Sequence, residues 1–505
     1  MTDSNNDRTW PRPTASRGGP ATVAAVLVAY AALQWGTLGI ASGRHYDEGV
    51  YLLSARALHD GHALFLEVFS SQPPAFLEAT ALALRLGGDR VESARLLILA
   101  FSLVGLAAVA DLGRRLGGWT AAAVAAAALA TSATFLQLGH LVQAETPALA
   151  TALVSLCLAL EAPRRRRPGA WFFAAGASMG LALLFKLFVA PLVPALAALL
   201  LLNEGSGQQE TWRLDRMSWR RVATGGLFLL AGLVALPLAS LLVYDRAAMM
   251  HQAIDFHVAK HQVYALHPTM NLSRLAGELA GEALTTALAL GGAAALARRA
   301  PLTAAWLGLW IAGVVFALAG QTPLFWRHFV LITPPLALLA GLAVAMFVDR
   351  TAVRKPWLLV CSTIVALLLA RGSLILAREG SVHAGAVEFG LVASRNAASP
   401  RLAEWLASNT VGGETVVGDD PTAIFLGGRR TAPALCDTSH ARIAAGFLRD
   451  DEAIRESAGA RVLVLRTGGR LLDLKRYAKW VERNYEQPPS APSAIWIRRE
   501  DAVDH

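Results

Sequence analysis

The chain has 505 residues, of which 54% are hydrophobic and 16% are charged, and its formal net charge is +9. Soluble domains carry about 25% charged residues, so this composition excludes an ordinary soluble protein and indicates a polytopic membrane protein. The basic residues lie in short gaps between apolar runs and form no solvated patch, which argues against nucleic acid as a partner.

Apolar runs recur through the first three quarters of the chain. A membrane crossing needs about 20 mostly apolar residues. The first run has no small-residue cleavage site, so we expect an uncleaved span there and not a signal peptide. The eleven predicted spans lie near residues 21–42, 91–112, 119–137, 145–161, 170–186, 187–202, 222–243, 276–297, 301–319, 328–348 and 356–377.

The segment 74–88, "PAFLEATALALRLGG", decides the topology. It is about 15 residues long, contains Glu78 and Arg85, and follows two prolines, which is typical of an interfacial or re-entrant helix. Counting it as a span would reverse the side of every later segment. We therefore predict interfacial helices in the first outer loop.

The positive-inside rule supports this choice. With 74–88 kept outside, the inner segments hold 18 basic and 8 acidic residues. These basic residues are Arg8, Arg12, Arg17, Arg114, Arg115, Arg164 to Arg167, Arg213, Arg216, Arg220, Arg221, Arg298, Arg299, Arg350, Arg354 and Lys355. The remainder of the chain is then close to neutral.

Three regions follow from this topology: a cytoplasmic tail at 1–20, a transmembrane module at 21–377 and an extracytoplasmic α/β domain at 378–505. In the last region "RLAEWLASN" predicts a helix, "ETVVGD" a strand, residues near 440–458 a helix, "ARVLVLR" a strand, "LLDLKRYAKWVERNY" a helix and "SAIWIRR" a strand. Cys436 is the only cysteine in it, so a disulfide within this domain is excluded.

Several charged side chains are expected on the outer face. Asp47 and Glu48 follow the first span, and Glu145 begins a later one. These acids suit a general base or a cation anchor, and they equally suit a solvated pair at a span end or a helix N-terminal acid. Lys186 and Arg327 interrupt apolar runs, where a charge marks a site or an interfacial anchor.

Two further features allow more than one interpretation. His257 and His261 are four residues apart, so on a helix they could share a metal, although no acid stands beside them in a zincin pattern; contact with an acceptor is the alternative, as is simple solvation. Gln72, before Pro73 and Pro74, suits a turn into the interfacial segment.

These segments together resemble the GT-C glycosyltransferases that use polyprenyl-phosphate or dolichyl-phosphate sugars, such as protein O-mannosyltransferases and lipid A aminoarabinose transferases. The similar stretches follow the family order: "HYDEGVYLLSARALHDG", "QPPAFLEATALAL", "ARLLILAFSLVGLAAVADLGRRLGG", "AETPALATAL", "GLALLFKLFVAPLVPAL" and "RHFVLITPPLALLAG". Each motif alone is weak, and the ordered set is more specific.

The resemblance implies an inverting transfer of a hexose or pentose from a polyprenyl monophosphate to an acceptor hydroxyl, outside the cytoplasmic membrane. It implies Asp47 as the base, Glu48 as an orienting group and Glu145 as an acceptor contact or a structural part of the site. Lys186 and the pair Arg327–His328 are then candidates for the lipid phosphate. The acceptor is a glycan, a lipid or a protein, and a divalent cation is compatible with the family.

The chain also departs from the family pattern. Aminoarabinose transferases have a lysine before Pro-Pro and an arginine soon after the acidic pair, where this chain has Gln72 and "GVY". Transfer to lipid A is therefore disfavoured, and other groups must meet the phosphate. A transporter or flippase of a lipid-linked saccharide is the alternative. Many transporters consist of two equal inverted repeats, and an odd number of spans such as eleven cannot be divided in that way. A membrane scaffold that presents the C-terminal domain is a third interpretation.

Overall fold

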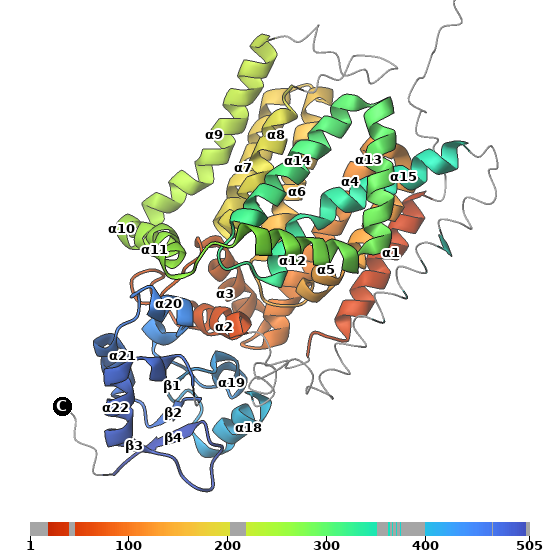
Figure 1. Ribbon diagram of the computed structural model, residues 1–505. Coiled ribbons are helices and arrows are strands. Elements are labelled where there is room, and N and C mark those ends of the chain that lie inside the picture. The colour runs from red at the N-terminus through yellow and green to blue at the C-terminus, as the bar shows by residue number, and fades with distance from the viewer. Residues whose placement is uncertain are drawn as a thin grey trace, which may run out of the picture.

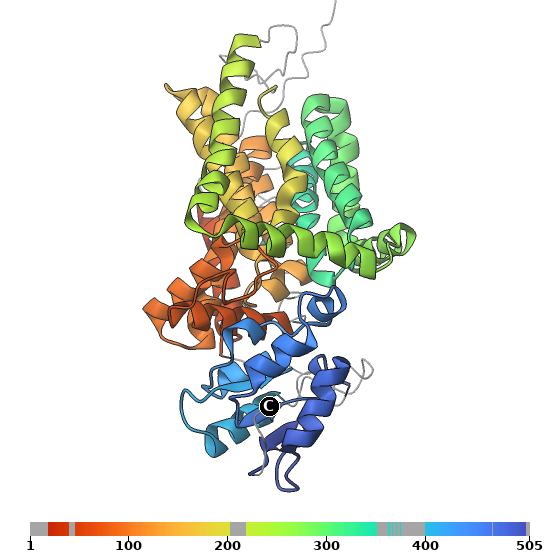
Figure 2. The same cartoon turned by 90° about the vertical axis from the view of Figure 1, so that its left-hand side faces the viewer.

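The computed structural model describes residues 19–39, 46–201, 219–350, 399–466 and 468–500, together with isolated positions between 351 and 398. Long helices form one bundle, and the C-terminal region (residues 399–500) lies beyond one end of it (Figures 1 and 2). The bundle helices are α1 (Gly19–Trp35), α4 (Val91–Ala130), α6 (Glu145–Glu161), α7 (Pro168–Phe185), α9 (Trp219–Val243), α13 (Ala283–Arg299), α14 (Pro301–Gly320) and α15 (Thr333–Arg350).

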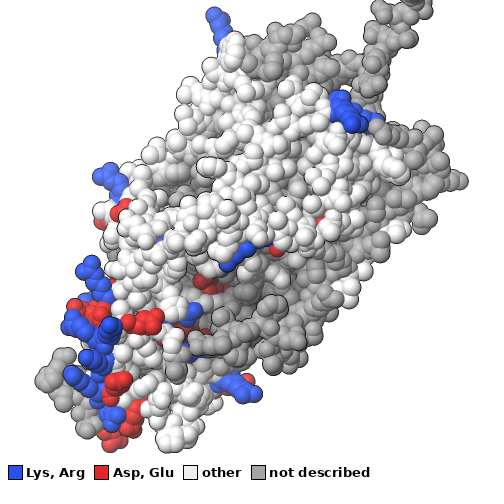
Figure 3. Space-filling model, viewed as in Figure 1, with Lys and Arg blue, Asp and Glu red and all other residues white. Residues whose placement is uncertain are grey.

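Most of these helices have the length and apolar composition of membrane spans. Within the described residues six helices are long and apolar enough to cross a bilayer, and a bent pair adds a seventh if it is one span. Much of the bundle surface visible in Figure 3, between its two ends, carries few charged side chains. The predicted span 356–377 lies outside the described residues. A polytopic helical membrane protein is confirmed, while the count of eleven spans stays a prediction.

A glycine pair divides α4 into two arms. Gly117 and Gly118 leave helical geometry, and the φ of +75° at Gly118 belongs to the left-handed region that glycine tolerates. A Cβ atom at Gly113 would lie 3.0 Å from the carbonyl oxygen of Ala121, so the arms approach closely after the turn. The predicted spans 91–112 and 119–137 fall on either side of this break. The second arm ends at Ala130, and α5 (Ala133–Leu138) follows it.

Two helices follow the first span at the end of the bundle that faces the C-terminal region: α2 (Tyr46–His59) and α3 (Ala75–Gly87). With 13 residues, α3 is too short to cross a bilayer. It buries Phe76 and Leu84 and exposes Leu82, as an amphipathic helix does. These features agree with the interfacial helix predicted at 74–88.

The helix after α7 is broken where the sequence suggested a span at 187–202. The chain forms η2 (Leu187–Leu192) and α8 (Val193–Ala198), and this apolar pair is shorter than the long spans. Pro191 and Pro194 interrupt the segment, and each proline removes a backbone donor that a continuous helix would use.

A second bend corrects the predicted span 276–297, which begins too early. The helices α12 (Pro268–Gly281) and α13 meet at an angle of 97°. Carboxylates near the bend join it to α5: Glu282 accepts a hydrogen bond from the Ala133 N–H (2.8 Å), and Glu278 accepts one from the Thr134 hydroxyl (2.5 Å). Before α12 the chain forms α10 (Arg246–Met250), a π-helical turn η4 (His251–Asp255) and α11 (Phe256–Val263).

The C-terminal region contains a small four-stranded sheet in the order β1-β2-β4-β3. The strand β1 pairs with β2 in parallel, whereas β4 is antiparallel to both β2 and β3. Its elements are α18 (Ser399–Asn409), β1 (Val416–Gly418), α19 (Pro421–Leu426), η6 (Pro433–Leu435), α20 (His440–Ala444), α21 (Asp450–Ser457), β2 (Val462–Val464), η7 (Leu471–Asp473), α22 (Lys475–Asn484), β3 (Tyr485–Glu486) and β4 (Ile495–Arg498). Most of the predicted elements are present, but the helix predicted near 440–458 is divided into α20 and α21, and the sequence analysis did not anticipate α19, η6 or β3.

The C-terminal region docks on α2. The Arg56 guanidinium donates to the carbonyl oxygens of Arg429 (2.8 Å) and Phe425 (3.1 Å), and lies 3.7 Å from the centre of the Phe425 ring. Gly49 is required at this junction, because a Cβ atom there would lie 2.4 Å from the backbone nitrogen of Thr422. These contacts thus join the C-terminal region to α2, the helix that begins with Tyr46 and Asp47.

Candidate functional site

Four charged side chains from four distant segments form one chain of ion pairs. Arg327 Nη2 lies 2.6 Å from Asp47 Oδ2, and Arg327 Nε lies 3.0 Å from Glu145 Oε1. The same Glu145 oxygen accepts a hydrogen bond from Lys186 Nζ at 2.6 Å. The structure therefore brings together the residues that the sequence analysis had nominated one by one.

Local backbone features explain how each group reaches this place. Asp47 is in the first turn of α2, and Glu145 is the first residue of α6, where the helix dipole favours a carboxylate. Lys186 has extended backbone angles at the break between α7 and η2. Arg327 lies in the short helix η5 (Trp326–Leu331), which precedes α15.

The four side chains of the chain of ion pairs differ in exposure, and Asp47 is the most exposed. The side chains of Glu145 and Lys186 are 0% and 9% exposed, that of Arg327 is 17% exposed, and that of Asp47 is 32% exposed. A buried charge needs a partner, and each of the two inner groups has one. Asp47 is therefore the carboxylate of this set that an outside molecule can reach most easily.

Glu48 points away from this set, although it is adjacent to Asp47. Its carboxylate receives Nε and Nη2 of Arg95, each at 2.8 Å, and the Val142 N–H at 3.1 Å. Both side chains of the pair are almost fully buried. This contact fastens the first turn of α2 to α4, so the structure gives Glu48 a positioning role.

Tyr51 is one turn after Asp47 and shares its face of α2. Its ring packs edge-on against Phe76, with 4.9 Å between ring centres. Burial raises the pKa of its phenol well above the ordinary value, as do the nearby charges of Asp47 and Glu145, while Arg327 opposes them. The Tyr51 hydroxyl therefore stays protonated and is a hydrogen-bond donor inside the site.

Lys260 is a buried cation near this site that the sequence analysis missed. It lies in the last turn of α11. Burial lowers the pKa of its ammonium to about 8, assisted by the charges of Lys186 and Arg327 and opposed by that of Asp47. The signal in the sequence was a lysine three residues after His257 in an outer loop, and it gave no hint that the side chain is buried.

The remaining candidates line the neighbouring segments. His257 Nε2 donates to the carbonyl oxygen of Ser71 at 2.8 Å, which joins α11 to the loop before Gln72. Gln72 is buried, and its amide lies 3.4 Å from the Ser71 hydroxyl. His328 is buried and accepts from the Phe325 N–H at 3.3 Å, whereas His261 is exposed on α11.

Comparison with known proteins identifies a similar family and similar folds. Residues 71–244 match the family model of dolichyl-phosphate-mannose-protein mannosyltransferase. The crystal structure of ArnT from Cupriavidus metallidurans bound to undecaprenyl phosphate superposes with a TM-score of 0.63 at 14% identity, covering 96% of this chain and 98% of that one. The chain has the GT-C glycosyltransferase fold. The resemblance inferred from the sequence motifs is thereby confirmed.

Two other GT-C structures are similar. The oligosaccharyltransferase of Archaeoglobus fulgidus, crystallised with zinc and sulfate, has a TM-score of 0.52 at 13% identity, over 94% of this chain and 72% of that one. The mycobacterial arabinofuranosyltransferase AftD has a TM-score of 0.51 at 15% identity, over 98% of this chain and 41% of that one. No curated protein sequence matches the chain.

The side chains of this GT-C site do not supply the ligand atoms that a divalent cation needs. Such ions usually take six or more oxygen ligands. The described part of the chain has no group of three or more histidine, cysteine, aspartate or glutamate side chains placed to hold a metal. Asp47 and Glu145 are both engaged by Arg327, and these two carboxylates alone cannot supply six oxygen ligands.

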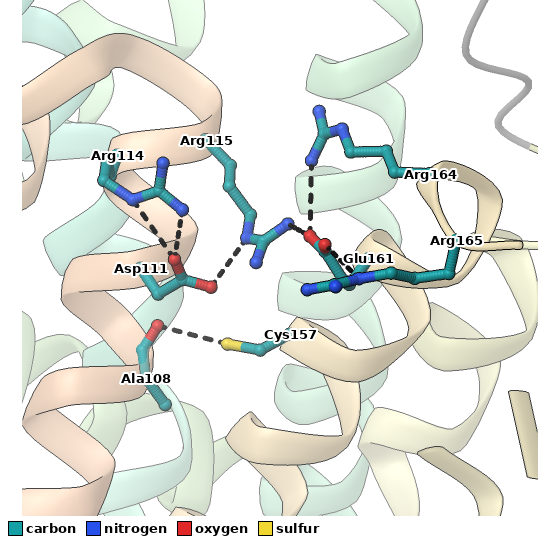
Figure 4. A network of polar contacts seen from close by, with 8 residues as sticks. All are labelled: Ala108, Asp111, Arg114, Arg115, Cys157, Glu161, Arg164 and Arg165. Atoms are coloured by element: carbon teal, nitrogen blue, oxygen red, sulfur yellow. Dashed lines mark hydrogen bonds and ion pairs between the residues drawn. The ribbon is translucent and has the colours of Figure 1, made fainter. Parts of the chain in front are cut away.

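The other end of the GT-C bundle holds a second polar network (Figure 4). Arg115 pairs with Asp111 (2.6 Å) and with Glu161, the last residue of the helix that Glu145 begins. Arg165 pairs with Glu161 (2.7 Å), and its guanidinium lies 4.6 Å from the centre of a Trp171 ring. Arginine beside tryptophan is typical of an interfacial anchor. The candidate site and this basic network thus lie at opposite ends of α6.

Proposed function

We propose that the protein is an inverting glycosyltransferase that moves a hexose or pentose from a polyprenyl monophosphate to an acceptor hydroxyl on the outer face of the cytoplasmic membrane. The observation that supports it most is the chain of ion pairs from Asp47 through Arg327 and Glu145 to Lys186. It offers one accessible carboxylate beside a buried set of cations, at the end of the bundle where the interfacial helices lie.

Asp47 serves as the general base. The acceptor oxygen attacks the anomeric carbon, the bond from that carbon to the phosphate oxygen breaks, and the acceptor proton moves to the Asp47 carboxylate. A base must lie within about 3 Å of the hydroxyl that it deprotonates. Arg327, 2.6 Å from Asp47, fixes the orientation of this carboxylate.

The leaving phosphate requires positive charge. Within the chain of ion pairs Asp47 and Glu145 balance Lys186 and Arg327, and the nearby Lys260 adds a further positive charge. Preorganised cations stabilise the charge that develops on a leaving phosphate. In this proposal Lys260, with Lys186 and Arg327, takes the place of the lysine and arginine that related transferases have near Gln72 and "GVY".

The geometry also limits the roles of the other candidates. Glu145 holds Lys186 and Arg327 in place from a fully buried position, which favours a structural part in the site over contact with the acceptor. His328, Gln72 and His257 shape the wall of the donor pocket through their backbone contacts. In this proposal the exposed His261 contacts the acceptor.

A flippase of a lipid-linked saccharide is the competing function. A transporter needs binding groups near the bilayer midplane and access from both sides. The ion pairs of Glu145 lie at one end of α6 and those of Glu161 lie at the other, and the helix between these two residues carries no charged side chain. This distribution favours a transferase that works at one membrane surface.

The decisive experiment is turnover by the purified protein in detergent or nanodiscs, with polyprenyl monophosphates that carry radiolabelled sugars and an envelope fraction as acceptor. The wild-type protein should transfer label. Asp47→Asn should retain donor binding and lose roughly 10²- to 10⁴-fold in turnover, because the amide cannot accept the proton. Sugar translocation across vesicles without transfer would instead establish a flippase.

A further inference from the structure

The turn that connects η6 to α20 in the C-terminal region lies against the first turn of α2. The Thr438 N–H donates to the Tyr46 hydroxyl at 2.9 Å, and the two hydroxyl oxygens are 3.0 Å apart. The Arg470 guanidinium lies over the Tyr46 ring, 3.6 Å from its centre. Tyr46, the residue before Asp47, is therefore hydrogen-bonded to Thr438, the residue after Asp437.

This contact brings Asp437 near enough to Asp47 for the charge of Asp47 to act on its carboxylate. Asp437 Oδ1 accepts the Ser439 N–H at 2.8 Å, which fixes its rotamer, and Arg442 Nη1 donates to the Asp437 carbonyl oxygen at 2.7 Å. The side chain stays partly accessible. The Ser439 side chain also acts on this carboxylate, which can still accept further hydrogen bonds because a carboxylate has about four acceptor sites.

Two carboxylates in one place are electrostatically unfavourable. Burial raises the pKa of Asp437, and the charge of Asp47 adds to this effect while Arg442 opposes it. The charges of Asp47 and Asp437 both act on Tyr51 as well. A site that keeps like charges together gains when a bound molecule supplies several hydrogen-bond donors.

We propose that Asp437 is an acceptor-binding residue, and that the acceptor is a saccharide or other polyol whose neighbouring hydroxyl groups meet Asp47 and Asp437. This inference rests on the proposed function and identifies the acceptor class. The attacked hydroxyl gives its proton to Asp47, while Asp437 accepts a hydrogen bond from the adjacent hydroxyl and takes no proton. A serine or threonine acceptor has one hydroxyl and would leave Asp437 unused.

The C-terminal region is then a part of the active site. Its turn at 436–439 forms the acceptor wall, and the donor wall comes from the bundle through Lys186, Arg327 and Lys260. The junction with α2 fixes the distance between the two carboxylates, since Tyr46 and Thr438 are bonded directly. An acceptor bound between them bridges the two parts of the chain.

The test compares Asp437→Asn with Asp473→Asn, a matched change of an exposed aspartate that pairs with His440 in the same region. Asparagine keeps the oxygen that accepts from Ser439. Transfer is measured with tritium-labelled sugar on polyprenyl monophosphate, with the envelope fraction of the source cells as acceptor. We expect Asp437→Asn to raise the acceptor concentration for half-maximal rate at least tenfold with an unchanged donor Kd, and Asp473→Asn to behave as wild type.

The product identifies the acceptor class. Label that resists protease and stays with a saccharide or polyol supports the inference, whereas label on peptide that β-elimination releases overturns it. An unchanged acceptor dependence in Asp437→Asn also overturns it, even when the wild type transfers sugar to a glycan. Absence of transfer by the wild type with every donor sugar would instead reject the proposed glycosyltransferase function.

Discussion

Arg95 holds the carboxylate of Glu48 in a two-point ion pair, with Nε and Nη2 each 2.8 Å from an oxygen of that carboxylate. The adjacent Asp47 points to a more open place and pairs with Arg327. Two acids that are neighbours in sequence thus have different surroundings, because successive residues of a helix face different directions.

The first prediction follows from this contrast. Glu48→Gln leaves the Arg95 guanidinium buried without a carboxylate, and breaking a buried pair in this way costs roughly 3–5 kcal/mol. We expect a clearly lower thermal unfolding midpoint for Glu48→Gln in detergent. Asp47→Asn, at a partly exposed position, should unfold close to wild type.

A matched control is Glu67→Gln, which removes an exposed carboxylate that pairs with His62 in the same loop. Exposed pairs contribute little to stability, so its unfolding midpoint should stay near that of wild type. Equal midpoints for Glu48→Gln and Glu67→Gln would contradict the structural role of Glu48.

The second prediction concerns topology. The basic network around Arg115 and the site around Asp47 lie at opposite ends of the bundle, and the positive-inside rule assigns the basic end to the cytoplasm. A reporter fused after Arg167 should therefore read cytoplasmic, and one fused at residue 400 should read external. Two reporters on the same side would reject the predicted topology and the outer position of the C-terminal region.

The sequence analysis anticipated much of the site because charges in apolar surroundings are conspicuous. Lys186 and Arg327 interrupt apolar runs, and a charge there is costly unless it has a partner. The pattern could not show that Glu145 joins them, because the three residues come from segments separated by 41 and 182 positions. Such pairings depend on helix packing, which local periodicity does not encode.

Other features could not be predicted from the sequence for the same reason. Nothing local to Asp437 relates it to Asp47, since the contact between Tyr46 and Thr438 spans 392 positions. The bend between α12 and α13 was missed because both sides of it are apolar enough to be read as one span. Its carboxylates Glu278 and Glu282, which bond to α5, were the available signal.

The third prediction is a pH dependence of stability that arises from Asp419. This side chain is buried, and one of its oxygens has no hydrogen-bond partner among the described residues. Burial raises its pKa to about 7, while a hydrogen bond from the Leu471 N–H and the charge of Arg470 oppose the rise. The folded protein therefore holds a proton that the unfolded chain, with a pKa of about 3.9, releases.

Between about pH 4 and pH 7 this group binds more protons in the folded state, so its contribution to stability falls as the pH rises and is lost above about pH 7. Asp419→Asn removes the titration. We expect the unfolding midpoint of Asp419→Asn, relative to wild type, to be higher at pH 8 than at pH 5. A difference independent of pH would contradict the assignment.

The last prediction concerns Lys260 and the donor phosphate. Losing one charge-assisted contact costs roughly 1.5–3 kcal/mol, so Lys260→Met should weaken binding of the donor about ten- to a hundredfold, measured by titration of the polyprenyl monophosphate sugar. His261→Ala, an exposed change on the same helix, is the control and should bind normally.

Because burial lowers the pKa of Lys260 to about 8, its positive charge is present below that pH and disappears above it. Donor affinity of the wild type should therefore fall as the pH rises through about 8, and Lys260→Arg, which stays charged, should remove this fall. Equal affinities for wild type and Lys260→Met at pH 7 would show that the phosphate lies elsewhere. A fall in affinity above pH 8 that persists in Lys260→Arg would assign the titration to another group.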